Sequence, residues 1–127
     1  IGVEMIEQPV PVGQDALLDG IKSPIPLLAD ESCQSRSDLA LCARYYDGIN
    51  IKLDKAGGLT EALAMAREAE ARGLKLMVGC MLSTSLGISP AFLVAQGALW
   101  VDLDGPILLA EDREDGFRFE KGIILPA

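Results

Sequence analysis

Apolar residues gather in five short runs along the chain, and a stretch with helical spacing follows each of the first four. The runs cover residues 2–9, 25–32, 48–58, 74–85 and 99–106. The helical stretches lie around Asp15–Ile21, over 35–46 and 59–73, and near Ser89–Gly97. Strands that are apolar throughout and alternate with amphipathic helices are typical of a parallel sheet covered by helices. The pattern therefore predicts an α/β fold.

Two local signals refine this prediction. In the helix predicted over 59–73, Thr60 is placed to cap the start and Gly73 to end it. The tail follows another pattern, because residues 116–125 alternate between apolar and polar around Glu120–Lys121–Gly122. Such alternation around a glycine is typical of a hairpin, or of a strand that leaves the main unit.

The composition narrows the classes of function. The 127 residues allow one compact domain at most, and no apolar run approaches the roughly 18 residues that cross a bilayer. The net charge of −8 argues against nucleic acid and anionic membranes as partners. Three cysteines without metal-ligand spacing, and no signal peptide, favour reduced thiols in the cytoplasm. The chain has no histidine, so acid–base chemistry falls to carboxylates and lysines.

Charged residues stand where four of the predicted strands give way to the following loop. They are Glu7, Asp30, Lys52 and Asp102. In parallel α/β folds this edge of the sheet carries the active site, because strand ends and helix starts converge there. The first three follow one another 23 and 22 residues apart, about one strand–helix unit each, which is the spacing of neighbours on a closed ring. We therefore expect the four side chains to converge on one cavity.

Several short motifs, taken in order, resemble the second half of an enolase-superfamily barrel. They are EQP (7–9), ADES (29–32), IKLDKAGGLTEAL (51–63), GCMLSTS (79–85) and DLDGP (102–106). Within that superfamily the chain is most similar to the dipeptide epimerases of the L-Ala-D/L-Glu type, and DLDGP is the motif that favours them. The resemblance implies a fold made of about strands 4 to 8 of a (β/α)7β TIM-like barrel.

The resemblance also implies a magnesium site. Glu7 and Asp30 match two of the family's metal-ligand carboxylates, at the ends of the fourth and fifth barrel strands. Removing a proton next to a carboxylate builds a second negative charge on an anionic group, and a hard divalent cation held by oxygen ligands neutralises it. Mg²⁺ is therefore the expected cofactor.

Lys52 matches the family's acid/base lysine, and Lys55 lies one helical step further, outside the site, as a supporting residue. We expect the pKa of Lys52 to fall toward working pH, through repulsion by Mg²⁺ and by another lysine. Asp102 and Asp104 match the Asp-x-Asp element that holds the free α-ammonium group of a dipeptide. The resemblance thus implies a dipeptide as the small-molecule substrate.

Three further residues are candidates for the surroundings of the site. Glu31 directly follows Asp30 and is either a supporting partner of the metal ligands or a solvated loop carboxylate. Cys80 and Ser83 lie at the end of the seventh barrel strand and are candidates for the pocket wall. No base partner is evident for either, which argues against a nucleophile.

Parts of the family pattern have no counterpart here: the second-strand lysines, a third metal ligand and the N-terminal capping domain. We therefore expect a C-terminal piece of a longer chain, with residues 1–110 as a partial barrel and 111–127 as a tail that packs toward the capping domain. The isolated piece is then expected to be aggregation-prone or molten, to bind Mg²⁺ feebly and to show no epimerase activity. The barrel residues expected to face solvent, or whatever the chain can fold over them, are Leu27, Leu28, Ile49, Ile51, Leu76, Val78 and Val101.

The expected function of the longer protein is Mg²⁺-dependent epimerization of a dipeptide, most simply L-Ala-D/L-Glu. A homo-oligomer is compatible with this function. Alternatives are another reaction of the superfamily, namely that of a muconate cycloisomerase, an o-succinylbenzoate synthase or an N-acylamino acid racemase. A non-catalytic packing module is a further alternative. A phosphoacceptor receiver domain has similar length and chemistry, but the order Glu, Asp, Lys, Asp-x-Asp fits it poorly.

Overall fold

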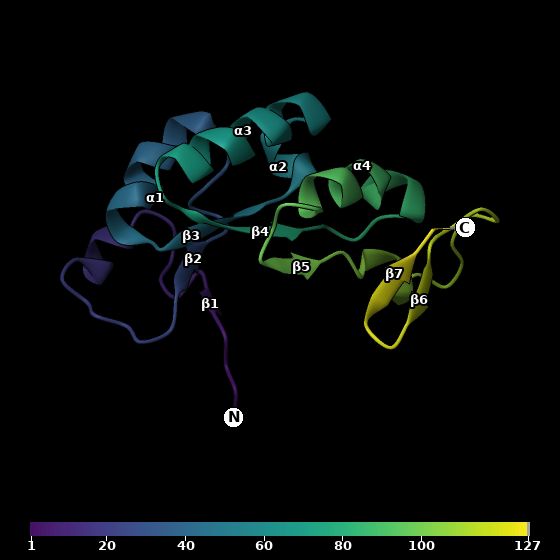
Figure 1. Ribbon diagram of the computed structural model, residues 1–127, viewed down its shortest axis with the longest axis horizontal. Helices are drawn as coiled ribbons and strands as arrows, with labels where there is room; N and C mark the ends of the chain where they lie inside the picture. Colours follow the sequence, from purple (N-terminus) through teal and green to yellow (C-terminus); the bar gives the residue numbers. More distant parts are fainter. Residues whose placement is uncertain (127) are drawn as a thin grey trace.

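A parallel sheet of five strands forms the centre of the computed structural model, which describes residues 1–126 (Figure 1). The strands are β1 (Ile6–Glu7), β2 (Leu27–Ala29), β3 (Gly48–Ile51), β4 (Lys75–Gly79) and β5 (Trp100–Asp102). Their order in the sheet is their order in the chain, and every neighbouring pair is parallel. The five predicted apolar runs thus each contain one strand, and the α/β prediction is confirmed.

The helices lie on one face of this sheet (Figure 1). They are α1 (Leu39–Tyr45), α2 (Leu53–Ala56), α3 (Leu59–Ala71) and α4 (Ser85–Ala95), with short 3-10 turns η1 (Asp15–Leu18), η2 (Arg36–Asp38) and η3 (Gly105–Leu108). The end of α3 is as predicted, because Gly73 has a φ of 77° and the next amide N–H donates to Ala69 O at 3.0 Å. The predicted cap at Thr60 is wrong: Gly58 precedes the helix and Thr60 lies inside it.

Helix α4 begins four residues before the predicted start at Ser89. The backbone N–H of Ser85 donates to Oδ1 of Asp112 at 3.0 Å, so a carboxylate 27 residues away caps the first turn. Pro90 lies inside the helix. No helix in residues 1–126 is long and apolar enough to cross a membrane.

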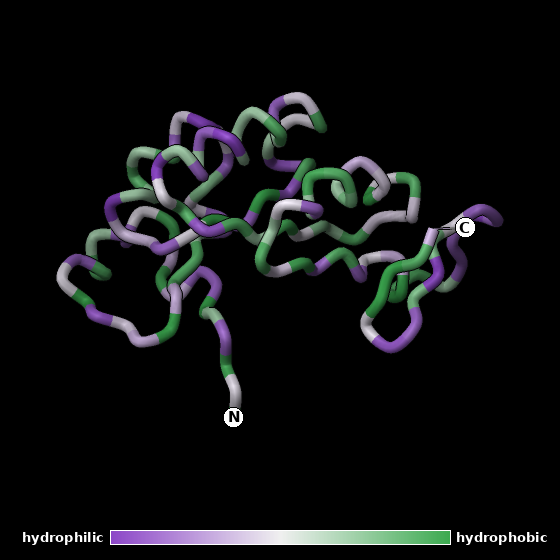
Figure 2. Tube along the Cα trace, in the orientation of Figure 1, coloured by the Kyte–Doolittle hydropathy of each residue, from purple (hydrophilic) through white to green (hydrophobic). Residues whose placement is uncertain are grey.

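The strand register decides which apolar side chains are covered. Residues paired in register share a face, so Glu7 and Leu28 lie on one face of the sheet together with Asn50 and Met77. This face is opposite the helices and is called the inner face below. The alternate residues point at the helices and form the main core with them, where Figure 2 shows hydrophobic segments facing one another.

The predicted exposure of barrel residues is therefore wrong for six of the seven named. They are at most 7% exposed: Leu27, Leu28, Ile49, Ile51, Leu76 and Val78. Only Val101, on the edge strand β5, is open to solvent, at 49%. Five of the six buried side chains, all except that of Leu28, are covered because the two-residue period of a strand turns them toward the helices.

The tail forms the hairpin that the alternation predicted. β6 (Arg118–Glu120) and β7 (Ile123–Leu125) pair antiparallel, and the turn residues Lys121 and Gly122 have φ values of 50° and 80°. Two consecutive positive φ values suit the right-handed twist of a tight hairpin. The hairpin lies beside α4 and β5 (Figure 1), where the Phe117 and Phe92 rings are 5.6 Å apart between centroids.

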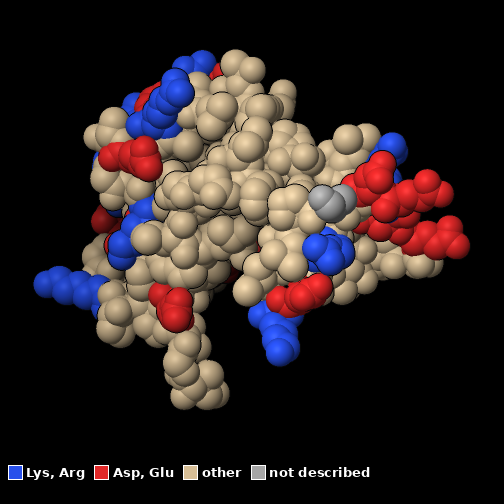
Figure 3. Space-filling model, turned by 45° about the vertical axis from the view of Figure 1, so that its right-hand side comes forward, with Lys and Arg blue, Asp and Glu red and all other residues tan. Residues whose placement is uncertain are grey.

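The negative charge is distributed unevenly. Acidic side chains gather at one end of the molecule, over the tail (Figure 3). The segment before the hairpin has four of them: Glu111, Asp112, Glu114 and Asp115. The carboxylates predicted to bind the metal and the substrate lie elsewhere, at the ends of the strands.

Candidate active site

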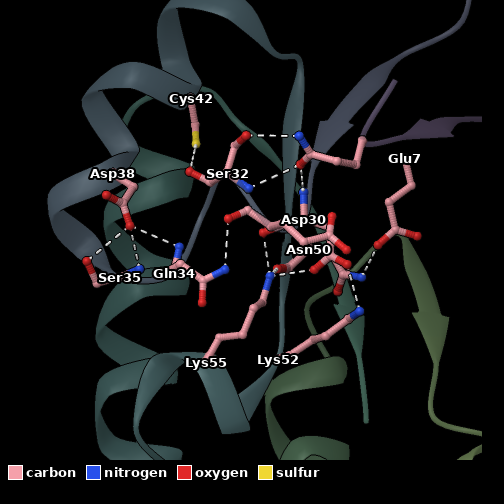
Figure 4. A network of polar contacts seen from close by, with 12 residues as sticks. Glu7, Asp30, Ser32, Gln34, Ser35, Asp38, Cys42, Asn50, Lys52 and Lys55 are labelled. Carbon is pink, nitrogen blue, oxygen red and sulfur yellow. Dashed lines mark hydrogen bonds and ion pairs between the residues drawn. The ribbon is translucent and has the colours of Figure 1, made fainter. Parts of the chain in front are cut away.

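Asp30 is the centre of a buried ionic cluster at the end of β2 (Figure 4). Its side chain is 7% exposed. Lys52 Nζ lies 2.7 Å from Oδ2, and Lys55 Nζ lies 2.5 Å from Oδ1 and 2.6 Å from the main-chain oxygen. Three of the predicted residues therefore meet, because β2 and β3 are parallel neighbours that end at the same edge of the sheet.

Local backbone structure explains why both lysines reach Asp30. Lys52 is still extended, with φ −118° and ψ 127°, and so continues β3 toward the site. The single turn of α2 then brings Lys55 back over the strand end, where its Nζ also donates to Asn50 O at 3.2 Å. Gly57, with φ 89°, ends this turn. The prediction that Lys55 stands outside the site is therefore wrong: it contacts Asp30 directly.

Glu7, at the end of β1, is held by a residue that the sequence reasoning missed. Asn50 Nδ2 donates to Glu7 Oε1 at 2.5 Å. Asn50 is two residues before Lys52, so both side chains leave β3 on the inner face. The signal was present in the sequence, since Asn50 is a second polar residue at alternate spacing in an otherwise apolar strand.

Gln8 is a second residue that the prediction missed, although it lies within the EQP motif. Its Oε1 accepts the backbone N–H groups of Asp30 (2.8 Å) and Ser32 (3.2 Å). Its Nε2 donates to Val10 O and to the hydroxyls of Ser32 and Tyr46 at 2.8, 2.9 and 3.3 Å. The backbone of Gln8 has a φ of 40°, which is uncommon outside glycine. Gln8 thus ties the loop after β2 to β1.

The charges in the cluster shift one another's titration. Burial and the charge of Asp30 raise the pKa of Glu7, although the Asn50 hydrogen bond opposes them. Burial alone would raise the pKa of Asp30, but hydrogen bonds from Lys52 and Lys55 hold it below its ordinary value. Burial alone would lower the pKa of Lys52, but Asp30 and then Glu7 raise it. Carboxylates are the nearest partners of Lys52 in this arrangement, which explains the raised pKa. The lowering expected from Mg²⁺ and a second lysine stays a prediction.

The Asp-x-Asp element lies at the end of β5 and is exposed. The pKa of Asp102 is raised by partial desolvation and by the neighbouring negative charge of Asp104. Both carboxylates border a cavity of about 380 Å³ whose other wall is the hairpin, including Phe119 and Ile124. Two like charges side by side are stabilised by a bound cation, so the arrangement suits an ammonium group.

The remaining candidates surround these groups. Glu31 is exposed, and its charge contributes to the raised pKa of Lys52. Cys80 is half-buried, and burial raises the pKa of its thiol, which keeps it protonated. Ser83 is half-buried, and its hydroxyl donates to Thr84 O at 3.4 Å. None of the three has a hydrogen bond to Asp30 or Lys52 among the described contacts.

The donor set fits a hard cation only in part. Glu7 and Asp30 supply carboxylate oxygens, the ligands that Mg²⁺ prefers. Within residues 1–126 no group of three or more histidine, cysteine, aspartate or glutamate residues is placed to hold a metal ion. Glu7 and Asp30 as metal ligands therefore stay a prediction, and a complete site would need further ligands.

The sequence matches the family described as enolase C-terminal domain-like over residues 1–126. It is 51% identical over 122 residues to the L-Ala-D/L-Glu epimerase of Escherichia coli strain K12, which covers 96% of this chain and 38% of the relative. It is 47% identical over 126 residues to the N-acetyl-D-glutamate racemase of a Pseudoalteromonas species, which covers 99% and 40%. The chain thus spans about two fifths of the length of these curated relatives.

Two solved structures extend the likeness to the fold. One is an enolase family member from Agrobacterium tumefaciens, homologous to dipeptide epimerases and solved with sodium and L-Ala-L-Glu; it is 58% identical, with a TM-score of 0.94 over 98% of this chain and 38% of that one. The other is the dipeptide epimerase of Methylococcus capsulatus with Mg and L-Arg-D-Lys, 36% identical, with a TM-score of 0.88 over 99% and 38%.

The predicted fold is confirmed by this agreement: the five parallel strands form a half-barrel that matches the C-terminal part of the superfamily's barrel domain. The match to the family spans nearly every residue, and two curated relatives share about half of the aligned positions. The chain therefore belongs to the enolase C-terminal domain-like family.

Proposed function

We propose that the protein containing this chain is a metal-dependent epimerase of dipeptides, with L-Ala-D/L-Glu as substrate. The observation that carries the proposal is the meeting of Asp30 with Lys52 beside Glu7 at one edge of the half-barrel. The E. coli relative, which is 51% identical over the same segment, is an L-Ala-D/L-Glu epimerase. As this chain spans 38% of that relative, the activity belongs to a longer protein.

Glu7 and Asp30 are the residues that would hold Mg²⁺. When bound there, the ion supplies neutralisation of the negative charge that develops on the substrate carboxylate as the α-proton leaves. The Methylococcus relative was solved with Mg and a dipeptide. The third ligand would come from outside the described residues.

Lys52 would take the α-proton on one face of the substrate and return it in the reverse direction. The neutral amine is needed for abstraction, and its pairing with Asp30 at 2.7 Å opposes that form. Lys55 lessens the opposition because its ammonium shares the same carboxylate. Inversion also needs an acid on the opposite face, which we assign to a part of the protein outside this chain.

Asp102 and Asp104 would bind the free α-ammonium group of the dipeptide, at the exposed end of β5. The hairpin beside them would pack toward a capping domain, with residues 1–110 as the barrel part and 111–127 as the tail. Location in the cytoplasm and assembly into a homo-oligomer stay predictions.

A second candidate function is racemization of an N-acylated amino acid. The observation in its favour is the 47% identity to the N-acetyl-D-glutamate racemase. An N-acetylated substrate has no ammonium group for Asp102 and Asp104, so these residues favour the dipeptide.

The test is α-proton exchange in D2O by the full-length protein, measured by NMR with L-Ala-L-Glu and with N-acetyl-D-glutamate as substrates. We expect exchange and epimerization of the dipeptide, lost on chelation of the metal. Faster turnover of N-acetyl-D-glutamate would favour the racemase, and turnover of neither by folded, metal-loaded protein would contradict both assignments.

A further inference from the structure

We propose that Asn50 is a positioning residue, which holds the Glu7 carboxylate in the orientation needed to bind the metal. The inference rests on the proposed function, in which Glu7 is a metal ligand. Its physical basis is the 2.5 Å hydrogen bond from Asn50 Nδ2 to Glu7 Oε1, visible in Figure 4.

This bond is not part of the sheet's own hydrogen bonding. Asn50 is on β3 and Glu7 on β1, and β2 lies between them in the sheet. Two strand spacings of roughly 4.8 Å separate the backbones, so the two side chains bridge the gap on the inner face, beside Asp30 at the end of β2. The bond therefore links β3 to β1 across β2, on the face of the sheet where the site lies.

Asn50 is also placed at a cost that an apolar residue would avoid. The residue is 1% exposed, and its Oδ1 is buried without a hydrogen-bond partner among residues 1–126. A buried, unpaired acceptor is unfavourable relative to an apolar group of the same shape. Met77, its register partner on β4, fills the neighbouring inner-face position with an apolar side chain. The amide is therefore better explained by its bond to Glu7 than by packing.

The neighbouring strand makes room for this amide. A Cβ on Gly79 would lie 2.8 Å from both polar atoms of the Asn50 amide and 3.1 Å from Lys52 Cε. Glycine at this position therefore lets the amide stand between β4 and Glu7. Without the amide, the Glu7 side chain loses its hydrogen-bond donor among residues 1–126, so the metal must order the side chain on binding.

The experiment compares Mg²⁺ binding by the full-length protein and its variants, using isothermal titration calorimetry, with circular dichroism to check folding. Asn50→Leu removes the donor while keeping the approximate shape. We expect it to raise the Kd for Mg²⁺ by about 10–100-fold, the usual effect of losing a partner of a metal ligand. Because Asn50 acts through Glu7, kcat for epimerization should recover when Mg²⁺ is saturating.

Gly79→Ala is the second variant, because it displaces the amide and leaves Asn50 and Glu7 in the sequence. We expect a raised Kd for Mg²⁺ here too, which decides the question if Asn50→Leu does not fold. Gln96→Leu is the matched control: it removes an exposed amide that bonds only Phe92 O within α4, and should leave the Kd unchanged.

An unchanged Kd in both folded variants would overturn the proposal. A kcat that stays low at saturating Mg²⁺ with a normal Kd would also overturn it, since Asn50 would then act on the substrate or on Lys52. If the wild-type protein binds Mg²⁺ but epimerizes neither substrate, the proposed function fails, while the Kd comparison still decides the role of Asn50.

Discussion

The two ends of the half-barrel hold carboxylates in opposite ways. At β1 to β3, Asp30 is 5% exposed and both of its oxygens are paired with lysines. At β5, Asp102 and Asp104 are exposed, and the negative charge of Asp104 raises the pKa of Asp102 more than the charge of Lys52 lowers it. The first arrangement fixes geometry, which proton transfer requires, and the second leaves negative charge open for a cation from solution. The contrast is consistent with the proposed function, in which the buried end carries the chemistry and the exposed end binds the substrate.

The strongest way to break this contrast is to remove the base from the buried end. Lys52→Ala in the full-length protein should lower kcat for epimerization by about 10²–10⁴-fold, the usual contribution of a positioned acid or base. Exchange of the α-proton should persist for one substrate antipode, because the opposite-face acid remains. NMR in D2O measures both rates.

The matched control for Lys52 is Lys75→Ala. Lys75 is an exposed lysine at the start of β4, the opposite edge of the sheet. The Lys75→Ala variant should turn over the dipeptide like the wild type. Wild-type epimerization by Lys52→Ala would remove Lys52 from the mechanism.

A substitution at the exposed end should lower turnover of the dipeptide less than the loss of Lys52. Asp102→Asn keeps the size and removes one charge, so kcat/KM for L-Ala-L-Glu should fall about tenfold, equivalent to about 1.4 kcal/mol. N-acetylation of the substrate should harm the wild type more than the variant, since the ammonium group is what the pair recognises. Asp115→Asn, in the exposed tail, is the control. Equal sensitivity of wild type and variant to acetylation would mean that the pair only solvates the barrel rim.

The hydrogen bonds that support the loop around Asp30 at the buried end can be tested by measuring the free energy of unfolding. Tyr46 donates to buried Asp15 at 2.6 Å and receives a hydrogen bond from Gln8, which holds the Asp30 loop. Tyr46→Phe should lower the free energy of unfolding by about 1–3 kcal/mol at neutral pH, because a buried carboxylate loses a donor. Urea unfolding measures the difference.

The effect of Tyr46→Phe should shrink in acid. Burial alone would raise the pKa of Asp15, but hydrogen bonds from Ser32 and Tyr46 lower it below its ordinary value. The charged carboxylate therefore stabilises the fold above its ordinary pKa, and this contribution is lost as the pH falls through the lowered value. A difference between wild type and variant that stays constant from neutral pH to about pH 3 would contradict this assignment.

The smallest effect concerns the tail. Asp112 caps α4 through Ser85, whose hydroxyl in turn accepts the N–H of Phe117 at 2.8 Å. Asp112→Ala should speed hydrogen exchange at the Ser85 and Phe117 amides, with little change in turnover. Glu114→Gln, in the same exposed segment, should leave both amides protected as in the wild type. Unchanged exchange in Asp112→Ala would mean that the hairpin is held by Phe117 packing alone.

Much of the fold followed from local patterns. Apolar runs ended by Glu7, Asp30, Lys52 and Asp102 gave the strands, their order and the edge that carries the site, because strand period and turn residues act over a few neighbours. The turn at Lys121–Gly122 was predictable for the same reason. The behaviour of the isolated chain in solution stays a prediction, and six of the seven apolar residues named for it are buried.

The tertiary structure alone decided which side chains from distant parts of the chain meet. Asn50 reaches Glu7 past an intervening strand, and Asp112 starts α4 from 27 residues away. Lys55 joins the site because one helical turn folds it back over Asp30, and the same carboxylate raises the pKa of Lys52. The amino-acid sequence determined which groups stand at the strand ends, since that depends on spacing along the chain. Hydrogen-bond partners and charges depend on distances through space, which only the packed strands set.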